Sequence, residues 1–182
     1  MAEAARDTSS QQDFSLEDCI IRFKDLGERR SSYQPVDTFL PRFQRDRYSV
    51  VGRGSEGTTK GKKTAEVKDF SIVYLRVEAG KGIADHAHNT SEVFIPLSGR
   101  WTATVGDKTT TLEAWDVISV PPSEMHSLIN ISGETAYVMT VNSGQAGAPT
   151  YFHKDILDEV RAAGGAVKDI DYPPDAAPGT RA

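Results

Sequence analysis

The sequence predicts an all-β fold, an antiparallel sandwich or barrel with a short helix at each end. From Phe70 to Asn142, short runs rich in β-branched and aromatic residues alternate with turn residues. Two of the intervening turns, Gly106-Asp107 and Gly133-Glu134, have the composition of tight hairpin turns. Apolar residues at helical spacing occur before and after this region. Together these observations favour a β core with helical extensions.

Size and composition restrict the class of protein. The chain has 182 residues, which favours one domain with extensions and a core of its own. Its net charge of −5 and scattered basic residues argue against a nucleic-acid partner. Cys19 is the only cysteine, and the polar start lacks the pattern of a signal peptide. Since no apolar run approaches the roughly 18 residues of a membrane span, we expect a cytoplasmic protein with no membrane partner.

The N-terminal end is expected to contain one short amphipathic helix. Residues 1–13 carry almost no large apolar side chains and are expected to be disordered. Between Ser15, a suitable N-cap, and Gly27, a suitable helix stop, apolar residues recur at helical spacing. Cys19 lies on this apolar stripe, so we expect its thiol to be buried and structural.

The segment 14–66 is expected to pack on the barrel as this helix, a linker and a strand. The linker between Tyr33 and Pro41 is expected to be irregular, and residues 47–51 are expected to form the strand. Residues 52–63 are rich in glycine and basic side chains, which predicts a mobile surface loop. A phosphate cradle is the alternative for this stretch, but the G-x4-G-K-[ST] pattern is missing.

The barrel itself is expected to span residues 67–150. Its strands are predicted at 70–78, 92–97, 101–105, 109–112, 117–120, 126–131 and 137–142. Residues 151–182 are expected to form a short helix, with Asp155 as its cap and Gly164 at its end, followed by a loose tail rich in proline and alanine.

Three of the four histidines have a spacing that indicates a metal site. His86 and His88 are two residues apart, so on an extended strand both side chains point to one face, and Glu92 follows after a short turn. His126 begins a later strand. If the strand layers fold over each other, these four side chains converge as a shell of three imidazoles and one carboxylate for a divalent first-row metal. Glu92 is also a candidate catalytic base.

Two motifs in this region resemble those of the cupin superfamily, a group of small β-barrels. The first motif, G-x5-H-x-H-x3-E-x6-G, is matched at Gly80, His86, His88, Glu92 and Gly99. The second, G-x5-P-x-G-x2-H-x3-N, is matched at Pro121, His126 and Asn130, while its two glycines are replaced by Trp115 and Ser123. We expect Trp115 to be an outward or capping aromatic and Ser123 to keep its turn.

The resemblance covers residues 70–142 and implies a jelly-roll barrel, also called a double-stranded β-helix. It implies one divalent transition metal ion per chain, with Fe²⁺ favoured and Mn²⁺, Ni²⁺, Co²⁺ or Zn²⁺ as alternatives, bound by His86, His88, Glu92 and His126. A cupin barrel with an empty site is the alternative. Because cupin barrels commonly pair, we expect a homodimer.

Strand alternation suggests which residues surround the metal. Phe94 shares the face of Glu92, and Leu128 shares the face of His126, so a largely apolar pocket wall is expected.

Weaker candidates for the pocket lie on other strands. Tyr74 and Arg76 share one face of the strand 70–78 and are candidates for anchoring a polar substrate group, with a solvent-facing pair as the alternative. Met139 is a candidate at the pocket opening. His153 lies outside both motifs and is expected to be a surface or packing residue.

The fold does not choose the reaction, so the site must. With Fe(II), open positions for substrate and dioxygen predict a non-haem dioxygenase that cleaves a small aromatic or β-dicarbonyl compound, which the expected apolar lining favours. With Mn, Ni, Co or Zn, the same shell suits an isomerase, decarboxylase or lyase on a small polar substrate, which a charged pocket would support. A non-catalytic module that binds a small molecule is the third hypothesis.

Overall fold

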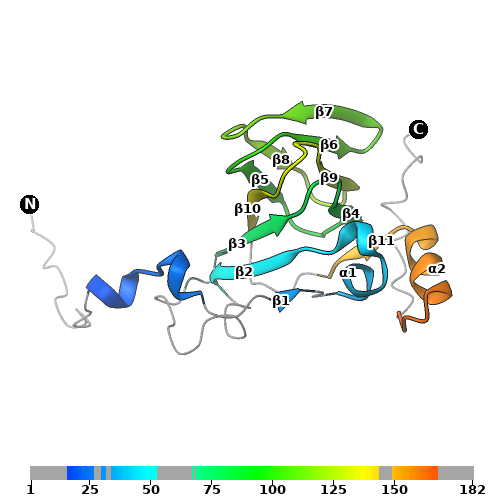
Figure 1. Ribbon diagram of the computed structural model, residues 1–182, viewed down its shortest axis with the longest axis horizontal. Coiled ribbons are helices and arrows are strands. Elements are labelled where there is room, and N and C mark those ends of the chain that lie inside the picture. The colour runs from blue at the N-terminus through cyan, green and yellow to red at the C-terminus, as the bar shows by residue number, and fades with distance from the viewer. Residues whose placement is uncertain are drawn as a thin grey trace, which may run out of the picture.

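The computed structural model describes residues 16–26, 30–31, 34–52, 67, 69–143 and 149–167. In these residues two antiparallel sheets form a barrel, with two short α-helices packed at one end (Figure 1). The predicted tail 1–13, the predicted cap Ser15, the stop Gly27, nearly all of the loop 52–63 and the end of the chain after residue 167 lie outside the described residues.

From β3 to β11 the strands alternate between the two sheets, as in a jelly roll, except that β6 and β7 lie in the same sheet. In chain order they are β1 (Arg30–Ser31), β2 (Asp46–Val51), β3 (Phe70–Val77), β4 (Gly82–Ala87), β5 (Glu92–Pro96), β6 (Trp101–Val105), β7 (Lys108–Leu112), β8 (Ile118–Val120), β9 (His126–Asn130), β10 (Ala136–Ser143) and β11 (Tyr151–Phe152). The six-stranded sheet has the order β1-β2-β3-β10-β5-β8, and the five-stranded sheet has the order β11-β4-β9-β6-β7. The all-β jelly-roll prediction is confirmed. β2 and β11, outside the predicted barrel 67–150, extend these sheets.

The main core lies between the sheets and follows from strand alternation. In β3 the buried residues alternate with partly exposed ones, so that Val73, Leu75 and Val77 face inward. Trp101 and Phe94 are the largest side chains that are fully buried in this core. Burying such a set of apolar side chains is the main free energy that holds the two sheets together.

The two turns predicted as hairpins differ in what they join. Gly106-Asp107 connects β6 to β7, whose ends pair through Val105 and Lys108, so this hairpin is confirmed. Gly133-Glu134 connects β9 to β10, which lie in different sheets, so its prediction as a hairpin is wrong. Gly133 has a φ of +74°, which explains the glycine, but turn composition alone does not fix which strands pair.

The predicted amphipathic helix at 15–27 is replaced by two 3₁₀ helices, η1 (Leu16–Cys19) and η2 (Phe23–Asp25). Phe23 and Leu26 pack on the outer face of the six-stranded sheet, where the ring of Phe23 lies 5.0 Å from that of Tyr48. Leu16 is 71% exposed, so no continuous helical face is buried. Cys19 is exposed, and its prediction as a buried thiol is wrong.

The linker expected between Tyr33 and Pro41 contains a short helix, α1 (Pro35–Phe39), followed by η3 (Pro41–Phe43). A proline at the first helical position has the backbone angle that a helix start requires, and the carboxylate of Asp37 accepts a hydrogen bond from the backbone N–H of Gln34. Five residues are too few to show helical periodicity in the sequence.

The C-terminal helix is α2 (Lys154–Ala162), so the predicted short helix is present and begins earlier than its predicted cap. His153, not Asp155, is its N-cap residue, and the imidazole Nε2 of His153 lies 3.2 Å from a carboxylate oxygen of Asp85. α2 packs against α1 and β4 through a cluster that includes Val36, Ala84 and Val160. No helix in the described part of the chain is long and apolar enough to cross a bilayer.

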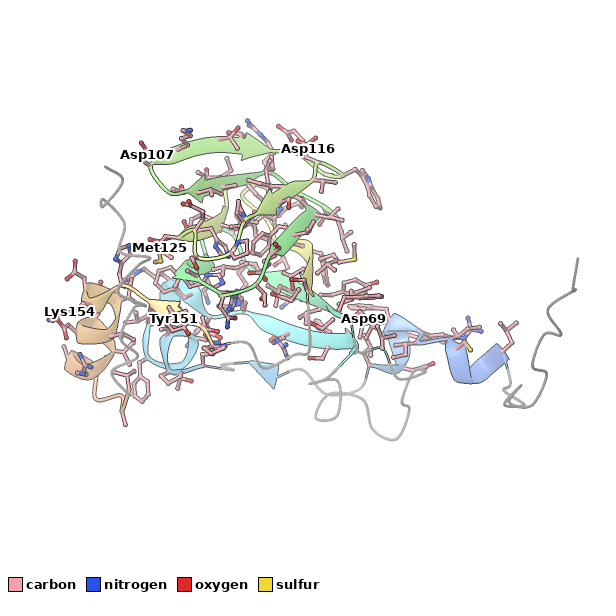
Figure 2. All side chains as sticks on the ribbon, turned by 180° about the vertical axis from the view of Figure 1, so that it is seen from behind. Asp69, Asp107, Asp116, Met125, Tyr151 and Lys154 are labelled. Carbon is pink, nitrogen blue, oxygen red and sulfur yellow. The ribbon has the colours of Figure 1, made fainter. Side chains whose placement is uncertain are left out.

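Figure 2 shows how the ends of the barrel differ. Asp107, in the β6–β7 turn, lies at the end formed by β7, whereas Tyr151, in β11, lies at the other end beside α2. Tyr151 pairs with Ala87 and Phe152 pairs with His86. The histidines of the first motif therefore lie toward the end of the barrel that α2 and the N-terminal strands cover.

Two residues carry backbone strain at the positions where the second motif has glycine. Trp115 has a φ of +74° and Ser123 a φ of +66°, and they are the only non-glycine residues in the described part of the chain with positive φ. The backbone thus keeps the conformation that glycine adopts without cost, although the side chains have changed. Trp115 is 73% exposed and points outward.

We expect Trp115→Gly to stabilise the protein. Relief of the left-handed strain should exceed the entropic cost of glycine by about 0.5–1 kcal/mol. Urea unfolding followed by circular dichroism measures this gain. Trp115→Ala is the control, because it removes the same ring and keeps the strained φ. A gain of equal size for alanine would show that removal of the exposed ring, and not the backbone strain, is responsible.

Candidate metal centre and cavity

Strands from both sheets bring four side chains together. His86 lies near the end of β4 and pairs in register with His126, the first residue of β9. His88 follows directly after β4, and Glu92 begins β5 in the other sheet. The four residues that the sequence predicts as metal ligands therefore meet where the two sheets face each other.

The cluster is compact and buried. One carboxylate oxygen of Glu92, Oε2, lies 3.5 Å from Nε2 of His86, 3.4 Å from Nε2 of His88 and 3.0 Å from Nε2 of His126. The ligand atoms of His86, His88 and Glu92 all lie within 4.8 Å of one another, so these three side chains alone could hold a metal ion. His86, His126 and Glu92 are at most 6% exposed.

Backbone carbonyls fix the orientation of all three imidazoles. The Nδ1 atoms of His86, His88 and His126 lie 2.8, 3.0 and 2.9 Å from the carbonyl oxygens of Ala84, Pro149 and Glu124, respectively. A carbonyl only accepts, so each Nδ1 must donate its proton, and each neutral ring then presents an Nε2 lone pair to the cluster. Histidines that bind metals commonly have this arrangement.

The charges of the cluster require a positive partner for Glu92. Burial raises the pKa of this carboxyl, but hydrogen bonds with the imidazoles, His126 first, outweigh burial and hold its pKa well below the usual range. Burial lowers the pKa of His86 to about 4, so this ring stays neutral at neutral pH. An imidazole can donate to Glu92 only if it carries two protons, which burial opposes. A divalent cation between three neutral rings and the carboxylate removes this conflict, so the residues fit a metal ion.

The metal affinity of the cluster should fall as the pH is lowered. Burial opposes the charge of His88, but its contact with Glu92 outweighs burial and raises its pKa above 6.5 in the metal-free protein. A proton on His88 must leave before metal binds, so acidification through this pKa should weaken binding by about tenfold per pH unit. His86 should compete only near its own pKa of about 4. Competition with a chromophoric chelator at several pH values measures this dependence, and a flat affinity from about pH 8 to about pH 6 would contradict it.

A cavity of about 140 Å³ adjoins the cluster. Inward residues of β3, β4, β5 and β10 line it, together with side chains from the segment that precedes β3. Apolar residues such as Val73 and Leu75 form part of the wall, but most of the described lining residues are polar or charged. The expectation of a largely apolar wall is therefore wrong.

The predicted pocket residues fall into two groups. Phe94 lines the cavity, and its ring lies 5.5 Å from that of His126. Leu128 is fully buried in the core between the sheets and does not line the described cavity.

Tyr74, Arg76 and Met139 lie on the outer face of the six-stranded sheet, because they alternate with the inward residues of β3 and β10. Tyr74 and Met139 are opposite each other in the register, and Arg76 forms an ion pair of 3.0 Å with Asp46. The structure thus places all three away from the cavity, which corrects the prediction that they line it.

Several cavity residues were not predicted from the sequence. Arg47 lines it from β2, Arg45 from the position directly before β2, and Gln34 from the N-cap of α1. Thr140 and Asn142 line it from β10, where they pair with Phe94 and Glu92. Strand alternation in the sequence could have identified Thr140 and Asn142 as cavity residues, because both lie on the same face of β10 as the buried Val138.

Comparison with known proteins agrees with this fold. A family model described as "Cupin domain" (Cupin_2) matches residues 73–155. A putative sugar phosphate isomerase from Acidithiobacillus ferrooxidans ATCC 23270 is similar in structure with a TM-score of 0.55 and 17% identity, over 76% of this chain and 83% of that one. A cupin 2 domain-containing protein from Halorhodospira halophila has a TM-score of 0.50 and 18% identity, over 65% of this chain and 76% of that one.

At these identities the two similar structures show the fold and no more. No curated protein matches the chain. The family match covers both motifs, and the fold that surrounds them is the jelly roll that the motifs imply. The chain therefore contains a cupin domain over residues 73–155.

Proposed function

We propose that the protein is a metal-dependent enzyme of the isomerase, decarboxylase or lyase type that acts on a small polar substrate. The observation that carries this proposal is the polar cavity beside the histidine cluster, with Arg45 and Arg47 in its lining. A bound divalent ion would supply Lewis-acid polarisation of a carbonyl or hydroxyl oxygen of the substrate. His86, His88, Glu92 and His126 are the residues that would hold this ion.

The size of the cavity supports a small substrate. Ligand pockets for drug-sized molecules are about 300–1,000 Å³. The cavity of this protein, at about 140 Å³, is smaller than that range. A molecule with only a few carbon atoms fits such a volume better than a compound with several rings.

The residues around the cluster are suited to orientation and to exclusion of water. Phe94 lines the cavity and is almost completely buried, as is His126, whose ring lies 5.5 Å from that of Phe94, so the reacting end of a substrate would be held away from solvent. Thr140 and Asn142 offer a hydroxyl and an amide beside Phe94 and Glu92, which can donate to or accept from substrate oxygens.

Glu92 fits the role of ligand better than the role of base. A general base works best when its pKa lies near the working pH. The pKa of Glu92 is held well below that of an ordinary carboxyl, which weakens it as a proton acceptor. Its role as a catalytic base stays a prediction from the sequence.

The dioxygenase expected from the sequence stays a hypothesis, and the apolar lining that favoured it is not found. Iron and dioxygen remain compatible with a shell of three histidines and a carboxylate. The homodimer also stays a prediction.

One set of measurements separates these functions. Protein purified without chelator is analysed for metals, and then each metal form is mixed with small keto and hydroxy acids in deuterated water. We expect NMR to show either exchange of a hydrogen next to the carbonyl for deuterium or loss of a carboxyl group next to the carbonyl. Neither reaction should take up dioxygen. Uptake of dioxygen by the iron form would instead support the dioxygenase, and binding without any change in the acids would support a binding module. His88→Ala is the control that should lose any metal-dependent reaction.

A further inference from the structure

The cavity has cationic residues that come from outside the cupin match. Residues 73–155 form the matched domain, whereas Gln34, Arg45 and Arg47 belong to the segment before it. This segment contributes η3 and β2, and β2 pairs along β3 and so extends the six-stranded sheet beside the cavity. A strand added to the barrel thus brings new side chains to the site.

The register of β2 places Arg47 on the inner face of the sheet. Arg47 is opposite Leu75, and Ser49 is opposite Val73, and both partners face the cavity. Side chains that are directly opposite on antiparallel strands lie on the same face. Nη1 of Arg47 donates to the hydroxyl of Ser49 at 2.5 Å, which holds the guanidinium along this inner face.

Arg45 is held more tightly and keeps one unused donor. Its side chain is 12% exposed, and its Nη1 atom contacts a carboxylate oxygen of Asp37 at 2.5 Å and the carbonyl of Phe43 at 3.0 Å. Its Nε atom is buried and has no hydrogen-bond partner among the described residues. A buried donor without a partner is costly, and Arg45 is one of the residues that line the cavity.

The charges of the cavity favour an anion. Arg45 pairs with the buried Asp37, and Arg47 is a second cationic residue in the lining. Glu92 is the only acidic residue among the described lining residues, and it faces the three imidazoles. With a divalent ion in the cluster, the described lining residues would carry a net positive charge, which attracts small anions.

We propose that Arg47 and Arg45 form an oxyanion subsite that binds a carboxylate or phosphate group at the end of the substrate that does not react. This inference rests on the proposed function and names its substrate class, a small acid with one oxygen on the metal and its anionic group on the guanidinium groups. Arginine matches both kinds of oxyanion through two parallel hydrogen bonds. The segment that precedes the cupin match therefore sets the specificity of the barrel.

The test uses small anions and does not require the natural substrate. Calorimetry measures the binding of malonate, acetate and inorganic phosphate to the metal-loaded protein and to the metal-free protein. With two carboxylates, malonate offers one to the metal and one to Arg47, and we expect the metal-loaded protein to bind it at least about tenfold more tightly than acetate. Stronger binding of phosphate than of malonate would identify phosphate as the oxyanion.

Arg47→Gln is the decisive variant, because Arg45 is tied to buried Asp37 and its loss could unfold the segment. We expect Arg47→Gln to weaken malonate binding by about 10- to 100-fold and to remove its advantage over acetate. Arg47→Lys should retain part of the advantage of malonate over acetate. Arg100→Gln is the matched control, since Arg100 is exposed, pairs with Glu113 and does not line the described cavity.

The outcomes separate the subsite from the metal chemistry. Unchanged malonate binding in Arg47→Gln, or equal affinities of the parent protein for malonate and acetate, would overturn the subsite. Metal analysis of the same samples tests the proposed function independently of the subsite. If the parent protein binds no metal, the proposed function fails, and the subsite is then judged on whether malonate or phosphate binding to the metal-free protein depends on Arg47.

Discussion

Replacing His126 with alanine should remove most of the bound metal while leaving the barrel folded. His126 is 1% exposed, and its Nε2 atom is the nearest of the three imidazole nitrogens to Oε2 of Glu92, at 3.0 Å. Its ring also lies 4.2 Å from the ring of His86. Loss of a partner that only orients a ligand weakens metal binding by about 10- to 100-fold, so loss of a ligand itself should weaken it by at least about 100-fold.

The same substitution should affect folding much less than binding. The ring of His126 lies 5.5 Å from that of Phe94, which lines the cavity, so the space that the imidazole leaves is close to the cavity and can take up water. The backbone pairing of β9 with β4 and β6 does not depend on this side chain. Metal content by elemental analysis, metal affinity by chelator competition and unfolding by circular dichroism together measure the two effects.

His153→Ala is the matched control for this experiment. It removes an imidazole that pairs with Asp85 and belongs to no part of the cluster, so metal content should stay at the level of the parent protein. His88→Ala should behave like His126→Ala. If both His88→Ala and His126→Ala keep one tightly bound metal ion per chain, the four-residue centre is wrong.

The ligand set could be predicted from the sequence because it depends on short-range spacing. His86 and His88 are separated by one residue, and strand alternation then places them on one face whatever the rest of the fold does. Their meeting with His126 depends on which strands pair, so spacing predicts it only on the condition that the strand layers fold over each other, and the resemblance to cupins implies that they do. The structure supplies the reason, since His86 and His126 are opposite each other on β4 and β9.

The cationic side of the cavity could not be predicted because it depends on long-range pairing. Arg47 was expected in a strand, but its face is fixed only by its register with Leu75, which lies beyond the glycine-rich stretch. Arg76 is the opposite example. Its position between apolar residues makes it a candidate for the pocket, but in the structure it lies on the outer face of the sheet and pairs with Asp46. Alternation along a strand sorts its side chains onto two faces, and only the packing of the two sheets shows which of these faces lines the interior.

The two tryptophans should differ strongly in their contribution to stability. Trp101 is fully buried between the sheets, and its indole Nε1 donates to the carbonyl of Ser98 at 2.8 Å. Trp101→Ala removes this bond and leaves a large hole in the core, which should cost about 3–5 kcal/mol of the free energy of unfolding. Since a domain of this size has only about 5–15 kcal/mol in total, the variant should lose much of its stability.

Trp115→Ala is the matched control, because it deletes the same side chain from a site that is 73% exposed. Its effect should lie within about 0.5 kcal/mol of zero. Thermal unfolding measures the contrast, with the melting temperature of Trp101→Ala expected to fall by roughly 6–20 °C and that of Trp115→Ala to change little. Equal melting temperatures for the two variants would mean that Trp101 does not fill the core between the sheets.

The loss of Trp101 should also reach the metal centre, because β6 pairs with β9 along its length. Trp101 is opposite Asn130, and Val105 is opposite His126, so β6 supports the strand that carries one of the predicted ligands. A weakened core should let β9 shift and so lower the metal affinity, although no ligand is changed. Metal added in excess should then recover part of the lost melting temperature, because a ligand that binds only the folded state stabilises it by mass action. If chelator competition gave the same metal affinity for Trp101→Ala and for the parent protein, β6 and the centre would not be coupled.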